Sequence, residues 1–157
     1  MNNLKINCKK GVNDILFGMS PKETERYLGT ATQQIKTAGI HKDEWFLESE
    51  MRDSVKFLYE ENQLVCVLQE FPSTCFVLNG EKIPSTLPEA VAFLQDKSLS
   101  YVCVPEKVFY IFRDLGIAIF PRVNIDVDNG VKQRTKIPRI AVCNDERMQW
   151  YYEAFMG

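Results

Sequence analysis

The sequence predicts an α+β protein in which two tandem units, each a short helix packed on an antiparallel sheet, precede a C-terminal hairpin and helix. Three observations support this: a helix-start motif that occurs twice, a strand, turn and strand pattern after each motif, and a change of pattern after Arg122. We expect one compact domain over residues 1–157, with repeats at about 12–70 and 77–122 and a C-terminal extension at 123–157.

The first unit contains a complete set of helix-start signals. The apolar residues 15–17 and Gly18 lead into Ser20-Pro21-Lys22-Glu23. This order is typical of a capping box, in which the serine hydroxyl and the glutamate carboxylate each accept a hydrogen bond from a free amide of the first turn. Leu28-Gly29 then predicts the end of a short helix.

A second helix start lies in the stretch "VLNGEKIPSTLPEAVAFL". Thr86-Leu87-Pro88-Glu89 has the residue types of the same capping box. The apolar residues that follow lie on one face of a helix, and they are Ala90, Val91 and Leu94.

The segments after the two helices also match each other. "KFLYEENQLVCVLQ" (56–69) aligns without a gap with "FYIFRDLGIAIFPR" (109–122), and in both a polar turn separates two apolar runs, which predicts a hairpin. "EWFLES" and "SYVCV" predict one earlier strand in each unit. Chance similarity is the alternative to duplication, but cap and hairpin recur in the same order. We also expect such a sheet pair to offer a broad, slightly concave surface.

The C-terminal extension predicts a hairpin and a helix. Asp128-Asn129-Gly130 is a strong turn signal, and residues 137–143 form a possible strand after it. A helix is expected from Asn144 or Asp145 and is expected to pack on one repeat. Its core-facing residues would be Met148, Tyr151, Tyr152 and Phe155, with Trp150 on another side.

Composition excludes some classes of function. A formal net charge of −2 argues against nucleic acid as a partner, because nucleic-acid-binding faces are strongly basic. No apolar run is long enough for a signal peptide or a membrane span, so no membrane partner is expected. Five cysteines without CxxC spacing, three of them in apolar runs, predict buried thiols in a reducing, cytoplasmic compartment.

The stretch "ILFGMSPKETERYLGT" resembles the opening of the BamE-like module of bacteria, which in tandem is the fold of the β-lactamase inhibitory proteins. The resemblance covers residues 11–29 and 45–69 and extends to the second copy, which lacks Gly-Met and Leu-Gly. It implies a protein-binding function, and double modules in the cytoplasm are similar to toxin immunity proteins. The sequence departs from the lipoproteins in having no lipidation signal and from the secreted inhibitors in having no plausible disulfide pattern.

Candidate catalytic and metal-binding residues have simpler structural interpretations. Ser20 is expected to be a helix cap rather than a nucleophile, and His41, the only histidine, an exposed loop residue. The sequence Asp126-x-Asp128-x-Gly130 fits a hairpin turn better than a calcium loop. We therefore expect no catalytic residues, no cofactor, no metal and no enzyme activity, although an enzyme of unknown type stays open.

An acidic stretch is the best candidate for a binding face. Residues 43–61 contain seven acids, two bases and several aromatic residues. We predict a face for a basic protein partner, such as a toxin nuclease, made of Glu44, Glu48, Glu50, Tyr59, Glu60 and Glu61. One alternative is a solvated sheet face with Trp45 in the core. The other is a scaffold or small-ligand-binding protein with a pocket between sheet and C-terminal helix, lined by Trp150, Tyr151 and Tyr152. The sequence leaves the oligomeric state open.

Overall fold

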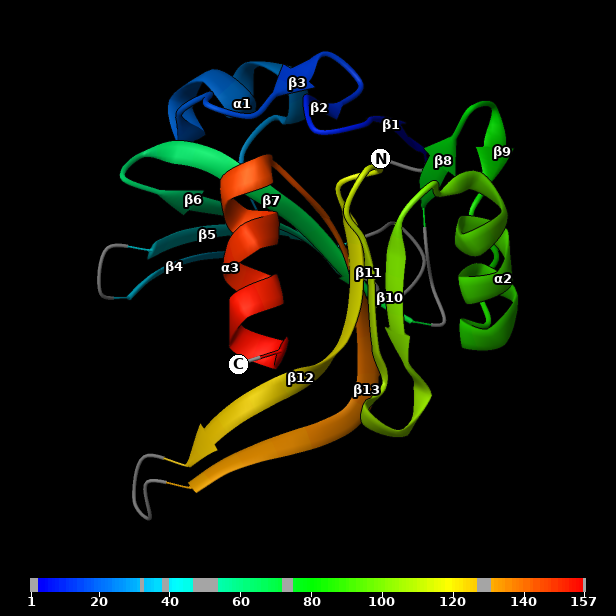
Figure 1. Cartoon of the computed structure of the whole chain (residues 1–157). Helices are drawn as coiled ribbons and strands as arrows, with labels where there is room; N and C mark the ends of the chain where they lie inside the picture. The colour runs from blue at the N-terminus through cyan, green and yellow to red at the C-terminus, as the bar shows by residue number, and fades with distance from the viewer. Residues whose placement is uncertain are drawn as a thin grey trace.

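An eight-stranded antiparallel sheet forms the centre of the protein (Figure 1). The computed structural model describes residues 3–31, 33–37, 40–46, 54–71, 75–126 and 131–156. The strand order is β10-β11-β12-β13-β7-β6-β5-β4. The strands are β4 (Gln33–Thr37), β5 (Ile40–Phe46), β6 (Ser54–Glu60), β7 (Gln63–Glu70), β10 (Tyr101–Val104), β11 (Phe109–Phe112), β12 (Ile117–Asp126) and β13 (Val131–Cys143). With the helices described below, the sheet confirms an α+β fold.

The large sheet consists of two groups of four consecutive strands that meet at β7 and β13, a strand pair that we call the seam. Each group follows a helix, α1 (Pro21–Leu28) or α2 (Leu87–Lys97), so each helix precedes four strands and not the three that were expected. The two hairpins aligned from the sequence differ in position, since β7 lies at the seam and β12 lies one strand away from it. Duplication of one unit stays a prediction.

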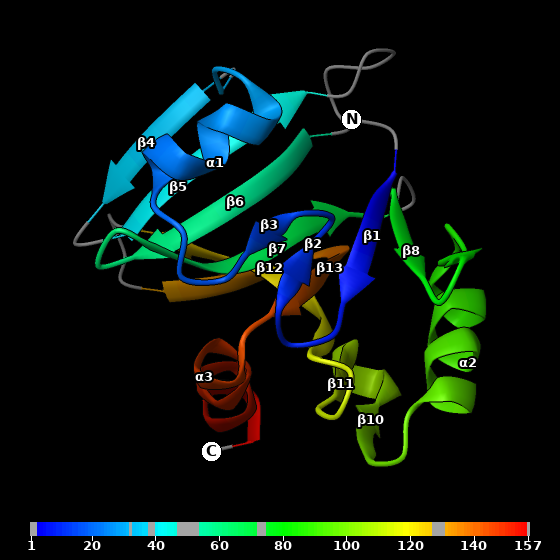
Figure 2. The same ribbon diagram turned by 90° about the horizontal axis from the view of Figure 1, so that it is seen from above.

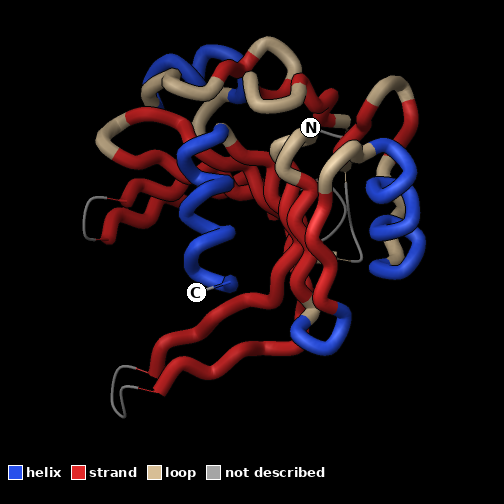
Figure 3. Tube along the Cα trace, viewed as in Figure 1, coloured by secondary structure: helices blue, strands red, loops and turns tan. Residues whose placement is uncertain are grey.

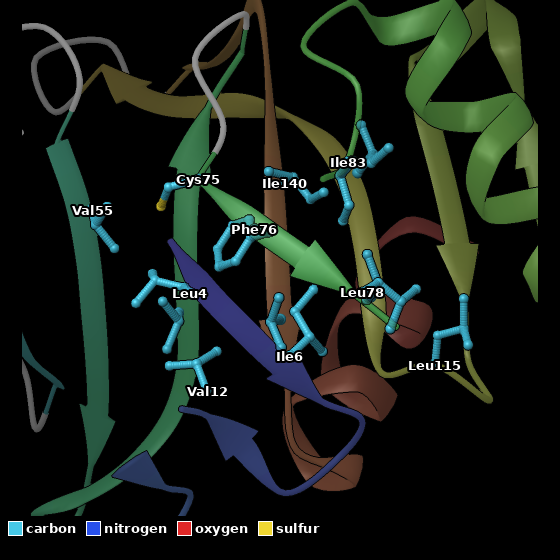
Figure 4. Packing of buried hydrophobic residues seen from close by; sticks show 14 of the residues in the cluster. Leu4, Ile6, Val12, Val55, Cys75, Phe76, Leu78, Ile83, Leu115 and Ile140 are labelled. Atoms are coloured by element: carbon cyan, nitrogen blue, oxygen red, sulfur yellow. The ribbon is translucent and has the colours of Figure 1, made fainter. Parts of the chain in front are cut away.

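A small second sheet covers one face of the large one. Its order is β3-β2-β1-β8-β9, with β1 (Leu4–Asn7), β2 (Gly11–Val12), β3 (Ile15–Leu16), β8 (Phe76–Leu78) and β9 (Glu81–Lys82). Strands β1 and β8 run parallel. The alternating burial of β1 directs Leu4 and Ile6 into the main core, where they pack with Phe76 of β8 and with Val55 and Ile140 of the large sheet (Figure 4).

The opposite face carries the terminal helix α3 (Asp145–Met156), which begins where it was expected. Its buried residues Met148 and Tyr151 belong to a second apolar cluster, which includes Leu68 of β7 and Phe120 of β12. The helix contacts β7, β12 and β13, so it packs across both strand groups and not on one repeat. Both faces are thus covered near the seam, which corrects the expectation of an open sheet surface.

The helices α1 and α2 lie at opposite ends of the molecule, α1 near β4–β6 and α2 beside β10 (Figure 2). The capping box of α1 is confirmed, because the Ser20 hydroxyl accepts from the Glu23 amide at 3.2 Å and the Glu23 carboxylate accepts from the Ser20 amide at 3.4 Å. The box expected for α2 is wrong, since the Thr86 side chain makes no cap hydrogen bond. Pro88 at the second helical position removes one of the two amides that such a side chain can cap.

The Gly-Met motif before α1 joins this helix to the seam. The Gly18 amide donates to the Leu64 carbonyl at 2.9 Å, and the Leu64 amide donates to the Met19 carbonyl at 2.8 Å. Gly18 has a φ of 99°, a conformation that residues with a side chain rarely adopt. The glycine is therefore explained by its backbone conformation, which brings the start of α1 against β7.

The C-terminal hairpin is longer than expected (Figure 3). Strand β12 continues through Arg122, with a register shift between Pro121 and Val123, and ends at Asp126 opposite Val131. Its partner β13 begins at Val131 and not at Ile137. The turn residues 127–130 lie outside the described residues, but the pairing on either side of them confirms a hairpin.

The longest helix in the described part of the chain, α3, has 12 residues. None of the described helices combines the length and the apolar composition that a membrane crossing requires.

Candidate functional site

A surface hollow of about 730 Å³ opens between the β6–β7 turn and the first turn of α3. The loop that follows β3 forms its third side. The hollow is lined by Lys9, Phe17, Gly18, Glu60, Glu61, Gln63, Leu64, Val65, Asn144, Asp145 and Glu146. Four of the lining residues carry a carboxylate and only Lys9 is basic, so we call it the acidic hollow.

The β6–β7 turn presents Glu61 at its tip. Glu60 pairs with Gln63, and the two residues between them, Glu61 and Asn62, have φ values of 49° and 65°. Two consecutive residues in the left-handed region are the mark of a type I′ turn, which joins strands with the right-handed twist of a sheet. The turn expected at "EENQ" is thus confirmed, and it holds a glutamate where asparagine or glycine fits better.

The first turn of α3 supplies the other two carboxylates. The Asn144 side chain accepts a hydrogen bond from the Arg147 amide at 2.9 Å and so caps the helix. The Asn144 amide donates to the Val65 carbonyl of β7 at 3.1 Å, which fixes the helix start beside the β6–β7 turn. Asp145 and Glu146 lie in this first turn, where the helix dipole favours negative charge.

Among the described residues, two of these four carboxylates form an ion pair with a basic side chain. Lys9 lies 3.5 Å from Asp145 in an exposed ion pair. The carboxylate of Glu60 lies 2.5 Å from Nη1 of Arg147, whose side chain is only 9% exposed. Glu61 and Glu146 are exposed residues of the lining. The hollow therefore has an excess of negative charge at its open side.

Arg147 is a buried cationic residue beside the hollow. Its guanidinium lies over the rings of Trp150, at 4.1 Å from the centroid, and Tyr151, at 4.7 Å. Burial alone would lower the pKa of Arg147, but the neighbouring Tyr151, Cys66 and Glu60 raise it above its ordinary value. The arginine therefore stays protonated and holds Glu60 in place.

The structure brings together only part of the predicted face. Glu60 and Glu61 line the hollow, whereas Tyr59 is fully buried in the main core and cannot belong to a binding face, which corrects that prediction. Glu44 lies in β5, opposite Lys56. Glu48 and Glu50 lie outside the described residues.

Asp145 and Glu146 are site residues that the sequence did not reveal. Their only sequence signal is their position at a helix start, which the helix dipole explains by itself. The pairing of β13 with β7 places them beside Glu60 and Glu61, and this pairing joins segments far apart in the chain.

The two candidate catalytic residues, Ser20 and His41, lie at a helix cap and in a strand. Ser20 caps α1, as expected. His41 lies in strand β5, paired with Tyr59 and Lys36, and not in a loop as expected. Among the residues that the structure describes, no group of three or more His, Cys, Asp and Glu side chains could hold a metal ion.

Of the three residues expected to line a pocket between α3 and the sheet, Tyr151 is buried, Tyr152 is partly buried and Trp150 is exposed. Tyr151 is 4% exposed and its ring lies 4.5 Å from that of Phe120, measured between centroids. Trp150 is half exposed on the outer side of α3. The hollow lies instead at the N-terminal end of this helix.

Comparison with known proteins found no relative of this chain. No family model, no curated protein and no solved structure matches the chain. The resemblance of residues 11–29 to the BamE-like module stays a prediction, and the geometry of the acidic hollow is the evidence that bears on function.

Proposed function

We propose that the protein is a non-enzymatic inhibitor of the immunity type, which binds and occludes a basic protein domain, such as a bacterial toxin nuclease, in the cytoplasm. One observation carries this proposal: the fold gathers Glu60, Glu61, Asp145 and Glu146 from two distant segments around one hollow. A lysine or arginine of the partner would enter the hollow and meet these carboxylates.

The charge arrangement suits a fast and specific encounter. Carboxylates at the edge of an interface steer a basic partner and repel acidic ones, and their effect is on the association rate more than on affinity. The Lys9–Asp145 pair is exposed, and such pairs contribute at most about 1 kcal/mol. A partner's cation could therefore replace Lys9 at little cost.

The conformation of Glu61 gives independent support. A residue with a side chain in the left-handed region costs about 1 kcal/mol relative to glycine, and such strain is typical of functional sites. Asparagine would relieve part of that strain. A carboxylate that contributes to binding would explain why a glutamate stands at this exposed tip.

The test compares two variants that change charge in the same way. The double variant, Glu61→Lys with Glu146→Lys, reverses two charges at the hollow, and the control variant, Glu89→Lys with Asp96→Lys, reverses the charges of two exposed residues of α2. A partner is captured from cells that encode it, purified, and measured for activity and for association rate. We expect the native protein to inhibit the partner and the double variant to associate at least about tenfold more slowly at low salt, with a weaker salt dependence.

The control variant changes the net charge by the same amount and should associate at nearly the native rate. The proposal is wrong if the purified partner is not inhibited, or if both charge variants slow association equally.

A small-ligand protein is the second candidate, and the size of the hollow favours it. Ligand sites are commonly 300–1,000 Å³, and the acidic hollow is about 730 Å³. Its charge predicts a small cation, for which spermidine is a suitable probe. Saturable thermal stabilisation by spermidine, lost in the double variant and absent with sodium chloride of equal ionic strength, would support this candidate over the inhibitor.

A further inference from the structure

Two cysteines face each other across the seam. Cys66 of β7 and Cys143 of β13 are paired in register, and both side chains are fully buried. The Cys143 thiol donates to the Cys66 sulfur at an Sγ–Sγ distance of 3.2 Å. Two thiols in such contact lie only about 1 Å beyond the length of a disulfide bond.

The backbone around the pair has the spacing that a disulfide needs. The Asn144 amide bonds the Val65 carbonyl, so these neighbours form the hydrogen-bonded pair and Cys66 and Cys143 form the next, non-hydrogen-bonded pair. In such pairs the Cα atoms are about 4.5 Å apart, which is within the range of disulfides. A bond could form here without a change of strand register.

The two thiols are chemically unequal. Burial alone would raise the pKa of Cys66, but the hydrogen bond from Cys143 and the charge of Arg147 bring it below its ordinary value. Burial raises the pKa of Cys143 well above its ordinary value, and the hydrogen bond to Cys66 adds to this. Cys66 is therefore the thiol that forms a thiolate first, and Cys143 keeps its proton.

We propose that Cys66 and Cys143 are a redox pair, which a peroxide converts into a disulfide that joins β7 to β13. The Cys66 thiolate attacks one peroxide oxygen, an S–O bond forms, the O–O bond breaks, and the departing hydroxide takes up a proton as water. The sulfur of Cys143 then attacks the sulfenic acid, an S–S bond forms, the S–O bond breaks, and the Cys143 proton leaves with the second water. Two thiols lose two electrons in all, and one peroxide gains them.

The position of the pair gives the bond a structural effect. Met148 and Tyr151 of α3 belong to the same buried cluster, so a peroxide reaches the sulfurs when this terminal helix opens locally. The residues next to the cysteines, Val65 and Asn144, line the acidic hollow. The disulfide would hold the two sides of the seam together at the base of this hollow. Formation of this disulfide does not depend on what the hollow binds.

The experiment treats the purified full-length protein with hydrogen peroxide, denatures it, blocks the remaining thiols with N-ethylmaleimide and maps the peptides by mass. The structure contains five free thiols. We expect the number of blocked thiols to fall by two, one peptide pair to join Cys66 to Cys143, and dithiothreitol to reverse both changes. The Tm should rise by about 10 °C on oxidation, because the bond closes a long loop.

Three variants provide controls. Cys66→Ala and Cys143→Ala should each abolish the cross-linked peptide and the rise in Tm. Cys103→Ala, which removes a half-buried thiol in β10, should keep both. The peptide map of the native protein decides the question even if a core variant does not fold. Five blocked thiols after peroxide, a disulfide between other cysteines, or Cys66 oxidised to sulfinic acid without a cross-link would each overturn the proposal.

Discussion

The Arg147 guanidinium and the Glu60 carboxylate, 2.5 Å apart, join the terminal helix to the β6–β7 turn. The Arg147 side chain is 9% exposed and that of Glu60 is 41% exposed, so the pair lies at the boundary between core and hollow. Arg147 also stacks on Trp150 and Tyr151 of its own helix. The pair thus fixes the position of Glu60 in the lining of the acidic hollow.

Loss of Glu60 and loss of Arg147 should have non-additive effects on stability, because the two side chains form one ion pair. Glu60→Gln leaves a buried guanidinium without its carboxylate, and we expect a loss of about 1–2 kcal/mol, because Glu60 is partly solvated. Glu60→Gln with Arg147→Met removes the buried charge as well and should cost less than the sum of the single changes. Urea unfolding of all four proteins measures this, and additive losses would contradict it.

Glu61→Asn should raise stability while it weakens association with a basic partner. Asparagine adopts the left-handed conformation of this turn more readily, so we expect a gain of about 0.5 kcal/mol. The lost carboxylate should slow association under the proposed function. Thermal unfolding and binding kinetics check the two effects, and Glu106→Asn, a change of an exposed glutamate outside the hollow, serves as the control. A fall in Tm for Glu61→Asn would contradict the strain argument.

Removal of the two N-cap hydroxyls should have unequal effects. Ser20→Ala breaks the capping box of α1 and should cost about 1 kcal/mol. Thr86→Ala is the matched change in α2, and it should cost much less because Thr86 makes no side-chain cap hydrogen bond. Denaturant unfolding compares the two, and equal losses would be inconsistent with this difference between the helices.

Asp114 should contribute an acid-sensitive part of the stability. Its carboxylate accepts from the Leu99 amide at 2.8 Å and from the Ser98 hydroxyl, and so joins the β11–β12 turn to the end of α2. Burial alone would raise the pKa of Asp114, but the hydrogen bonds from Leu99 and Ser98 lower it below its ordinary value. A depressed folded-state pKa stabilises the protein above the unfolded-state pKa of about 3.9, and this stability is lost as the pH falls through the folded value.

We therefore expect Asp114→Asn to lower stability by about 1 kcal/mol at pH 7 and to have little effect near pH 2. Asp96→Asn, a change of an exposed carboxylate in α2, is the control and should have a small effect at both values. Thermal unfolding at a series of pH values measures this difference. A loss that is the same at pH 2 and pH 7 would contradict the role of the Asp114 carboxylate.

The sequence alone determined the elements whose signals are local. Ser20 and Glu23 lie three residues apart and make the capping box that their order predicts. The turn at Glu61, the hairpin after Phe109 and the start of α3 near Asn144 are likewise set by neighbours along the chain. Local signals gave a wrong prediction at two places. At Thr86 the expected side-chain cap is not made, and at Arg122 strand β12 continues past a register shift.

The tertiary structure decided what depends on strand pairing across the seam. Pairing of β7 with β13 places Cys66 against Cys143 and brings Asp145 and Glu146 beside Glu60 and Glu61. Tyr59 is buried because it belongs to the main core, whose members come from both sheets. Hydrophobic alternation fixes which residues of a strand share a face, but many strand orders satisfy the same alternation. The choice among them is made by the packing of the whole chain, which is why the hollow and the thiol pair could not be read from the sequence.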